Sequence, residues 1–289
     1  MTKSPPGLRK SLQDFKSQLS NLPRWSWPLL GLLLAALLAL VIWLVVQVWP
    51  EAEDLTWQRI NDTGVIRVCT DPSWPPFEFI DERTTEIKGL DIDLASAVAA
   101  RLRPEGPPIR AELVPVGFDS LYDALLAGRC DAVLSALPYE PERTEDVAYA
   151  ISYFNAGMVI VVRDGSADIA GLDNLPGRVV GVEWGFVPEG NSQQRLLLQS
   201  LSLRRYDTAL DVLRALQSGE IETALVDQVS ALDYLYQCQG LHIVGQPFTD
   251  VSYVIPVRLD AFRLLAELNR VLIEMREDET LSGLLNKWF

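Results

Sequence analysis

The chain is poor in the side chains that most often carry metal or nucleophilic chemistry, with three cysteines and one histidine among 289 residues. There is no CxxC spacing and no cluster of cysteines and histidines, so a metal site is not expected, and no Ser/His/Asp catalytic set is evident. His242 lies in a predicted strand, where a structural role is favoured. The odd count leaves at least one thiol unpaired, and a disulfide between the other two is an open alternative that the spacing does not support. Cys69 and Cys130 fall in predicted strands, where we expect small buried apolar side chains.

Basic residues are scarce as well, because 25 Lys and Arg stand against 39 Asp and Glu. Five of the basic residues and one acidic residue lie in the first 49 positions, which leaves 20 basic and 38 acidic residues in the remainder, a net charge of −18. A domain so acidic repels nucleic acid, which is therefore not an expected partner. Solubility is a sufficient reason for the charge.

One long run without charge stands out at residues 29–49. Its 21 residues match the hydrocarbon thickness of a bilayer, and tryptophans flank it as they do at membrane interfaces. The basic residues precede the run, so we expect a single-pass anchor over 28–49 with a cytoplasmic N-terminal tail over 1–27. A cleaved signal peptide is the alternative, but the residues after the run make a poor cleavage site. The tail is either an amphipathic helix or a weakly ordered segment.

Two segments, 121–134 and 212–225, have nearly the same pattern: an apolar-periodic helix, a glycine stop and a short apolar strand. Glycine followed by a strand also occurs twice, at 64–69 and 177–182. Strands that alternate with helices indicate an α/β protein with mostly parallel sheets. We therefore predict two similar lobes with a ligand cleft between them.

The predicted organisation places a linker or a first helix at 50–63. Lobe 1 spans 64–161 and 250–289, and lobe 2 spans 162–249. Near the end, 253–258 is predicted as one strand, and 264–275 and 281–289 as helices. Asp91 or Asp93 is predicted to cap a helix that runs to Leu102.

Ligands of parallel sheets bind beyond the carboxyl ends of the strands, which selects four places in this chain. The candidate binding residues there are Asp71, Trp74, Phe118, Ser135, Leu137, Arg143, Trp184, Phe186 and Asp227. An arginine in one lobe and an aspartate in the other suit a zwitterion, because guanidinium pairs with carboxylate and aspartate accepts from ammonium. The alternatives are a surface ion pair of Arg143 with Glu140 or Asp146, and a helix-capping role for Asp227.

Several motifs in order resemble the family 3 bacterial extracellular solute-binding proteins, the polar amino-acid receptors of ABC importers. They are IRVCTD at 66–71, PPFEF at 75–79, GLDIDLA at 89–95, PER at 141–143, YFNAG at 153–157 and NKWF at 286–289. The resemblance covers about residues 64–289. It implies a two-lobed periplasmic-binding-protein-like fold of type II with a hinge, here preceded by one transmembrane helix.

The resemblance also implies roles for individual residues. Arg143 corresponds to the arginine that holds the ligand α-carboxylate, and Asp227 to the acid that holds its α-ammonium. Asp71 and Trp74 fall at side-chain contacts, and Phe118 at the opposing aromatic wall. The chain departs from the family at Pro138, where Ser or Thr is usual, and at 185–187, where GFV replaces GTT. Each departure removes a donor for the carboxylate.

The predicted function is extracytoplasmic binding of a small zwitterionic solute, most simply an amino acid, for delivery to an ABC transporter permease. No enzyme activity, cofactor or metal is expected, and the binding domain is expected to be periplasmic or extracellular, tethered to the cell membrane. A dehydratase-like enzyme with Glu183 and Glu189 as acid or base is one alternative. A compatible-solute receptor and a sensor that signals through the N-terminal tail are the others.

Overall fold

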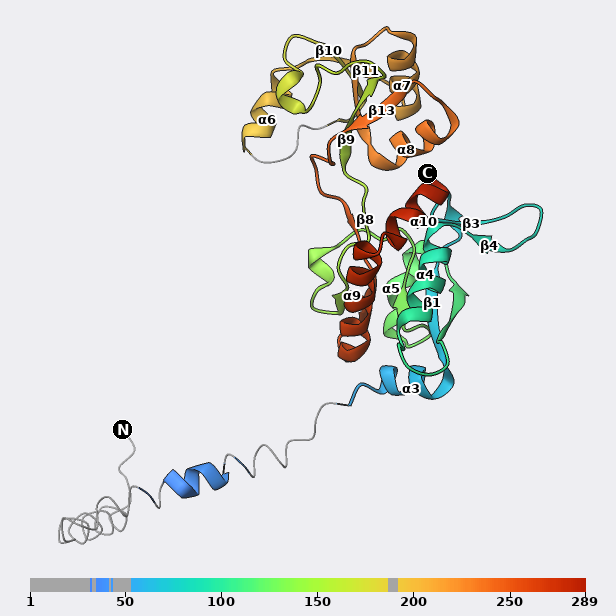
Figure 1. Cartoon of the computed structure of the whole chain (residues 1–289), viewed down its shortest axis with the longest axis vertical. Helices are drawn as coiled ribbons and strands as arrows, with labels where there is room; N and C mark the ends of the chain where they lie inside the picture. Colours follow the sequence, from blue (N-terminus) through green and yellow to red (C-terminus); the bar gives the residue numbers. More distant parts are fainter. Residues whose placement is uncertain (1–31, 33–34, 42, 44–52, 187–191) are drawn as a thin grey trace, which may run out of the picture. The chain divides into compact units, whose positions relative to one another are not determined.

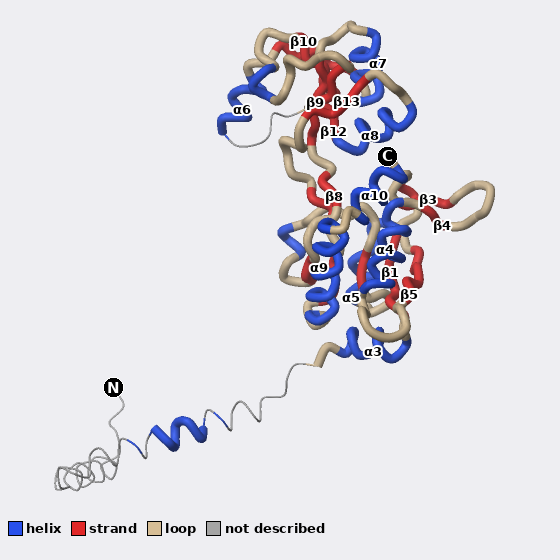
Figure 2. The backbone as a smooth tube through the Cα atoms, viewed as in Figure 1, coloured by secondary structure: helices blue, strands red, loops and turns tan. Residues whose placement is uncertain are grey.

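The computed structural model describes residues 32, 35–41, 43, 53–186 and 192–289 (Figures 1 and 2). Two units are distinguished, residues 1–53 and the compact unit 54–289. Within the second unit, helices and strands alternate in two lobes, each built around its own sheet. The predicted two-lobed α/β architecture is therefore confirmed.

Lobe 1 contains a five-stranded sheet in the order β5-β1-β6-β15-β7. Its strands are β1 (Val65–Thr70), β5 (Arg110–Pro115), β6 (Ala132–Val133), β7 (Val147–Tyr149) and β15 (Pro256–Arg258). β1 pairs in parallel with β5 and β6, whereas β15 pairs antiparallel with β6 and β7. The end of the chain thus returns to complete the first sheet.

The helices of this lobe are α3 (Leu55–Thr63), α4 (Leu90–Arg101), α5 (Leu121–Leu126), α9 (Phe262–Glu277) and α10 (Thr280–Trp288). A small antiparallel sheet joins β2 (Ser73–Trp74), β3 (Glu78–Ile80) and β4 (Ile87–Lys88). α3 contacts β1 and α9, so the predicted linker or first helix contains a helix that packs on the lobe. α4 begins after Gly89, with Asp91 and Asp93 in its first turn rather than at its cap.

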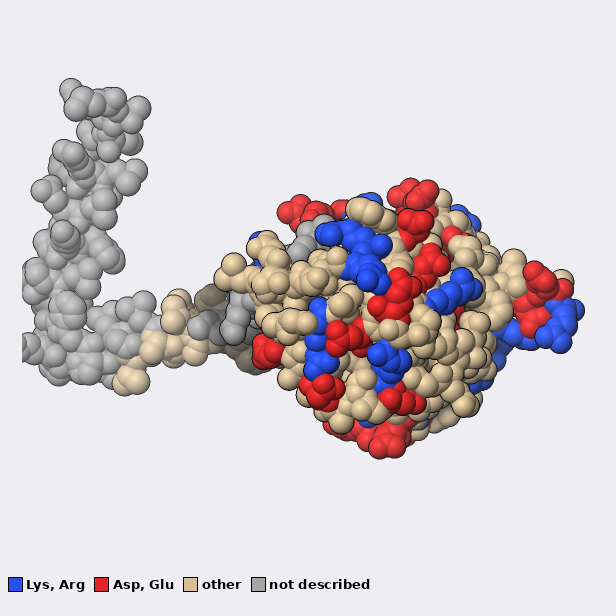
Figure 3. Space-filling model, turned by 90° about the horizontal axis from the view of Figure 1, so that it is seen from above, with Lys and Arg blue, Asp and Glu red and all other residues tan. Residues whose placement is uncertain are grey.

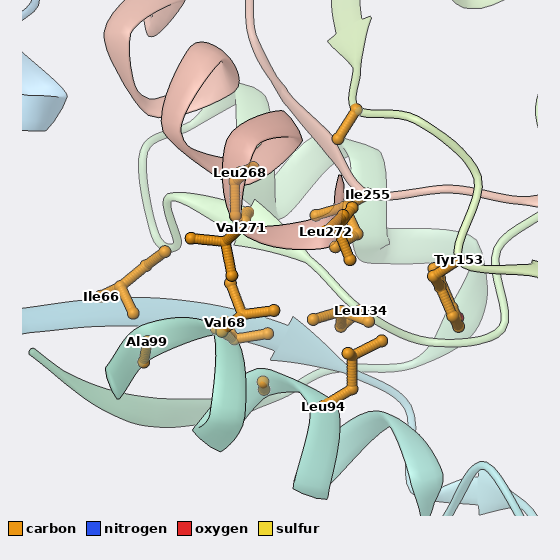
Figure 4. Close-up of a cluster of buried hydrophobic side chains, with 14 of the residues drawn as sticks. Ile66, Val68, Leu94, Ala99, Leu134, Tyr153, Ile255, Leu268, Val271 and Leu272 are labelled. Atoms are coloured by element: carbon orange, nitrogen blue, oxygen red, sulfur yellow. The ribbon is translucent and has the colours of Figure 1, made fainter. Parts of the chain in front are cut away.

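The core of lobe 1 follows from the period of two in its strands. Ile66 and Val68 face α4 and α9, where Leu94, Leu268 and Val271 complete a buried apolar cluster (Figure 4). The residue between them in the pleat points to the other face, and Cys69 continues that second face against α5. The sheet is therefore covered by helices on both faces.

Cys69 and Cys130 form a disulfide with a Cα–Cα distance of 5.7 Å, so they are buried as expected but are joined by the bond that their spacing does not indicate. The physical reason is that β1 and β6 are neighbours, which brings together two residues 61 apart in sequence. Both are fully buried in the α5 face of the sheet. Cys238 is the free cysteine.

Lobe 2 contains a second five-stranded sheet in the order β11-β10-β12-β9-β13. Its strands are β9 (Met158–Arg163), β10 (Val179–Glu183), β11 (Ser202–Tyr206), β12 (Thr223–Asp227) and β13 (Leu241–Val244), and its helices are α6 (Ser192–Gln199), α7 (Ala209–Ser218) and α8 (Gln228–Gln237). Acidic and basic side chains are interspersed on the face drawn in Figure 3.

The internal repeat has the predicted structure. In lobe 1, α5 is followed by Gly128 at φ 69° and then by β6; in lobe 2, α7 is followed by Gly219 at φ 84° and then by β12. The positive φ suits glycine, which ends each helix at no steric cost. The two copies place β6 and β12 next to β1 and β10, respectively.

Two segments join the lobes, and they pair as β8 (Phe154–Asn155) with β14 (Ser252–Tyr253) (Figure 1). Gly157 lies so close to the second segment that a Cβ there would stand 2.0 Å from the carbonyl oxygen of Thr249. The predicted strand 253–258 is interrupted between β14 and β15, because its first part belongs to this crossing and its second part to the lobe 1 sheet.

The predicted tail and most of the predicted anchor lie outside the described residues. Residues 35–41 are helical. Among the residues that the structure describes, no helix is both long and apolar enough to cross a bilayer.

Candidate functional site

A pocket of about 380 Å³ lies on lobe 1, where the chain leaves β1 and β6. We call it the lobe 1 pocket, and it is lined by Asp71, Ser73, Trp74, Glu78, Phe118, Ser135, Ala136, Pro138, Val251 and Tyr253. These residues come from β2, β3, the crossing segment that contains β14, and the segments that follow β1, β5 and β6. The strand-end rule therefore brings together Asp71, Trp74, Phe118 and Ser135, four of the predicted site residues.

Hydrogen bonds fix the polar part of this pocket. The backbone N–H of Phe118 donates to Asp71 Oδ2 at 2.9 Å, which holds the carboxylate beside the aromatic ring. The N–H of Asp71 donates to Ser135 Oγ at 2.9 Å. The loops after β1, β5 and β6 are thus joined to one another through Asp71.

Two large aromatic side chains on this pocket remain open to solvent, since Trp74 is 53% and Phe118 is 47% exposed. Aromatic surface that is left in water beside a carboxylate is a typical feature of a ligand site. Both rings can contact an apolar chain, and their faces attract a cation. Together with Asp71 they make a surface suited to a positively charged organic group.

Beneath the pocket lies a buried acid pair, Glu78 and Asp91, which are 1% and 0% exposed. Ser135 Oγ donates to Glu78 Oε1 at 3.0 Å, and the Ala136 N–H donates to Asp91 Oδ2 at 2.6 Å. Burial raises the pKa of Glu78 to about 10, and the Asp91 carboxyl adds to the shift. Burial also raises the pKa of Asp91 to about 6, against hydrogen bonds from Ala136 and Tyr153 that lower it.

A second pocket, of about 490 Å³, lies on lobe 2 where β10 and β12 end. This lobe 2 pocket is lined by Ala156, Gly157, Met158, Glu183, Trp184, Gly185, Phe186, Leu225, Val226, Asp227, Thr249 and Val251. It contains the predicted residues Trp184, Phe186 and Asp227. Trp184 is 65% exposed, and the guanidinium of Arg205 lies 5.8 Å from the centre of its ring.

Asp227 has the helix-capping role considered as its alternative, and it also lines the lobe 2 pocket. It is the N-cap of α8, where its Oδ1 accepts from the N–H of Ser230 at 2.8 Å. The cap fixes the orientation of the carboxylate, because the side chain must face the free N–H groups of the first turn. Within the described residues, its other oxygen has no hydrogen-bond partner.

Two predicted site residues are placed elsewhere. Leu137 is 1% exposed and packs in the α5 face of the lobe 1 core, so the prediction that its side chain contacts ligand is corrected. Arg143 lines neither pocket. Its guanidinium lies 4.8 Å from the centre of the Tyr122 ring and 3.6 Å from the Glu140 carboxylate, which is the surface ion pair considered as its alternative.

The sequence analysis missed Glu78, Ser73, Val251 and Tyr253 as pocket residues. Glu78 stands within the PPFEF motif, and that motif is the signal that could have drawn attention to it. Val251 and Tyr253 lie in the second crossing segment, about 180 residues after Asp71, and no local pattern relates them to the first strand. Glu189 and Val187 lie outside the described residues.

In the part of the chain that is described, no group of three or more His, Cys, Asp or Glu is placed to hold a metal ion. The Glu78–Asp91 pair lacks a third ligand of this kind. The described residues of the two pockets offer hydrogen-bonding groups, carboxylates and aromatic faces.

Comparison with known proteins identifies relatives of the whole two-lobed unit. A putative ABC transporter arginine-binding protein of Escherichia coli (strain K12) is 29% identical over 232 residues, which covers 78% of this chain and 90% of the relative. The structure of an ancestral cationic amino acid solute-binding protein is 30% identical, with a TM-score of 0.58 and coverage of 81% and 99%. An ancestral cyclohexadienyl dehydratase is 25% identical, with a TM-score of 0.70 and coverage of 82% and 97%.

The family model for bacterial extracellular solute-binding proteins, family 3, matches residues 66–289. Apart from Val65 at the start of β1, this range includes both sheets, the crossing strands and all the residues of the two pockets. The chain therefore belongs to the family 3 bacterial extracellular solute-binding proteins.

Proposed function

We propose that this protein binds a small zwitterionic solute, an amino acid, outside the cytoplasm and delivers it to an ABC importer. The observation that carries the proposal is one accessible carboxylate in each lobe, each beside exposed aromatic rings: Asp71 with Trp74 and Phe118, and Asp227 with Trp184. One oxygen of each carboxylate accepts a hydrogen bond from a backbone N–H. The other oxygen is then available to an ammonium or guanidinium group of the ligand.

Arg143 is assigned to the ligand carboxylate. Its present partner, Glu140, is 40% exposed and lies at 3.6 Å, and ion pairs so open to water contribute about 0–1 kcal/mol. A bidentate pair of hydrogen bonds from Arg143 to the ligand carboxylate in a closed site is stronger than this exposed ion pair. The exchange of Glu140 for the ligand is therefore favourable. Closure of the lobes about the crossing segments would bring the ligand groups of both lobes together.

The side chain of the ligand is assigned to the lobe 1 pocket. Asp71 between two exposed rings suits a cationic side chain, because carboxylate and ring faces both attract positive charge. The related proteins named for arginine and for cationic amino acids support this class of ligand. Pro138 lines the same pocket and has neither an N–H nor a hydroxyl to offer, so the carboxylate contacts are fewer than in the family pattern.

Membership of the family supports delivery to an importer and an extracytoplasmic location as parts of this proposal. The buried Cys69–Cys130 disulfide suits an oxidising compartment such as the periplasm. A tether at residues 28–49, with the N-terminus in the cytoplasm, completes the proposal.

A dehydratase on the same fold is the second candidate, favoured by the TM-score of 0.70 to the ancestral cyclohexadienyl dehydratase. Glu183 on the lobe 2 pocket is the described carboxyl that such an activity would use. Incubation with a cyclohexadienyl carboxylic acid and chromatography of the products distinguish the two functions. Release of a dehydrated product, lost in Glu183→Gln, would replace the receptor assignment.

Calorimetry with the purified full chain tests the receptor function against L-arginine, L-glutamine, L-cystine and glycine betaine. We expect an amino acid to bind, and Arg143→Ala to weaken it by about 10- to 100-fold through loss of charge-assisted hydrogen bonds. Arg83→Ala is the matched control, since this arginine is exposed in the turn between β3 and β4. Binding of no amino acid, or equal affinity in both variants, contradicts the proposal.

A further inference from the structure

The buried acid pair, Glu78 and Asp91, has one unpartnered oxygen on each side chain. Glu78 Oε2 and Asp91 Oδ1 are buried and, among the described residues, have no hydrogen-bond partner. Each of the two carboxyl groups acts on the pKa of the other, and the two accept hydrogen bonds from adjacent residues of one loop, Ser135 and Ala136. A proton on one of the two oxygens would satisfy both at once.

Electrostatics requires such a proton. Two carboxylates side by side out of water repel each other strongly, and no Lys or Arg is among the groups that act on either of them. A carboxylic acid that donates to a carboxylate relieves the repulsion and leaves one negative charge instead of two. That charge is stabilised by the donors that Asp91 already has, Ala136 N–H and Tyr153 OH, at 2.6 and 2.9 Å.

We propose that Glu78 and Asp91 share one proton, and that the pair is a positioning device for the loop that forms the floor of the lobe 1 pocket. The loop starts at Ser135, whose hydroxyl donates to Glu78, and continues through Ala136, whose N–H donates to Asp91. Both residues line the pocket. The part of the inference that concerns ligand affinity rests on the proposed receptor function.

The loop needs such support because its backbone is strained. Ala136 has φ 43°, a left-handed conformation that a residue with a Cβ seldom adopts. The short hydrogen bond to buried Asp91 holds it there. Ser135 in turn accepts from the N–H of Asp71, so the position of the proposed ligand contact Asp71 depends on the same pair.

The pair also reaches the segment that joins the lobes. Tyr153, which donates to Asp91, directly precedes β8 in the crossing and is 3% exposed. The loop of the pocket and the start of the crossing are therefore hydrogen-bonded to one carboxylate. Tyr253 of β14 lies close enough that both acids act on its pKa, which burial raises to about 12.

The charge state of the acid pair makes the stability of the folded protein depend on pH. The titratable groups that act on the pair are Asp71, which raises the pKa of Glu78 further, and the two buried tyrosines, whose pKa values are raised. In the folded protein Glu78 keeps its proton well above the pH at which it ionises in the unfolded chain. The folded state therefore binds one more proton than the unfolded state, and stability falls as pH rises through this window.

Infrared spectroscopy of the full chain at pH 7 tests the shared proton directly. We expect a C=O stretching band of a protonated carboxylic acid that is absent from Glu78→Gln and present in Glu86→Gln. Glu86 is a suitable control because it is exposed in the neighbouring turn and pairs with Lys88 at 3.6 Å. Absence of the band from the wild type, or its survival in Glu78→Gln, overturns the proposal.

Thermal and urea unfolding from pH 5 to 9 test the positioning role without a ligand. The amide that Glu78→Gln introduces can donate to Asp91 through its nitrogen while its oxygen accepts from Ser135, so this variant copies the protonated state at every pH. The unfolding equilibrium constant of the wild type should rise by up to about tenfold per pH unit relative to Glu78→Gln. Parallel profiles for the two proteins would refute the shared proton.

Calorimetry tests whether the acid pair affects the affinity of the pocket for a ligand. With L-arginine as the probe at pH 7, Glu78→Ala, which leaves Ser135 without its acceptor, should weaken binding about tenfold. Glu86→Gln, in the exposed turn, should bind L-arginine as the wild type does. Equal affinity in Glu78→Ala rejects the link to the pocket. If no amino acid binds any form, the receptor proposal fails, while the infrared and unfolding results still decide whether the proton is shared.

Discussion

Removal of the Cys69–Cys130 disulfide should cost this protein a large part of its stability. The bond closes a loop between residues 61 apart in sequence. The loop-closure entropy for that length is about −14 cal/mol/K, which corresponds to about 4 kcal/mol at 25 °C. Because typical domains are stable by about 5–15 kcal/mol, the loss is a substantial fraction of the total.

The measurement is urea unfolding of Cys69→Ala/Cys130→Ala, followed by tryptophan fluorescence. With an m value of about 2–3 kcal/mol/M, the midpoint should fall by about 1.3–2 M. Trp57, Trp74 and Trp288 report on lobe 1, while Trp184 reports on lobe 2. The loss should be confined to the lobe 1 transition wherever the two lobes unfold separately, because both cysteines belong to the lobe 1 core.

Two controls separate the covalent bond from the side chains that are deleted. The reduced wild type should be destabilised to within about 1 kcal/mol of the double variant, since Cys→Ala also removes two buried sulfur atoms. Thiol titration of the unfolded, unreduced wild type should find one reactive group, from Cys238. Three reactive thiols, or a stability loss below about 1 kcal/mol, would refute the reasoning.

Two further substitutions test the crossing and the first helix. Gly157→Ala should destabilise the protein by about 1–3 kcal/mol in urea unfolding, because its Cβ would stand 2.0 Å from Thr249 O. Gly117→Ala, which has open space around it, should be nearly neutral. Equal losses of stability in the two variants would contradict the close approach of Gly157 to Thr249. Asp54→Ala should cost about 2 kcal/mol, because this buried carboxylate accepts from Trp57 N–H at the start of α3 and from two N–H groups at the start of α9. A loss below about 0.5 kcal/mol on urea unfolding would show that these caps contribute little.

The sequence predicts the parts of the fold that local patterns control. Apolar periodicity and a glycine stop are enough to place α5 with β6 and α7 with β12, since Gly128 and Gly219 end their helices through their own backbone conformation. No local pattern predicts the interruption between β14 and β15. The residues there alternate as in a single strand, and only the crossing back to β8 separates the two parts.

The disulfide illustrates the limit most clearly. Both cysteines are buried as the apolar pattern predicts, but Cys69 lies in β1, whereas Cys130 lies two residues before β6 begins. Whether they meet depends on the pairing of β1 with β6 and on its register, which places Cys69 opposite Val133. No pattern within either strand contains that register.

The candidate site, like the fold, is predictable from the sequence only in part. The rule that ligands bind at strand ends selects loops, so it brings Asp71, Trp74 and Phe118 to one pocket. It does not select side-chain direction within a loop. Leu137 turns into the core, and Arg143 lies over the ring of Tyr122, because the local contacts of each decide the rotamer.

The buried acids also change the electrostatic interpretation of the lobe 1 pocket. The acidic composition of the chain suggests nothing beyond solubility, since most of its carboxylates are on the surface. If Glu78 and Asp91 hold one proton between them, the pair adds a single buried charge that the donors Ala136 N–H and Tyr153 OH stabilise. Asp71 is then the carboxylate that a ligand meets, and the preference of this pocket for a cation depends on that one side chain and the two rings beside it.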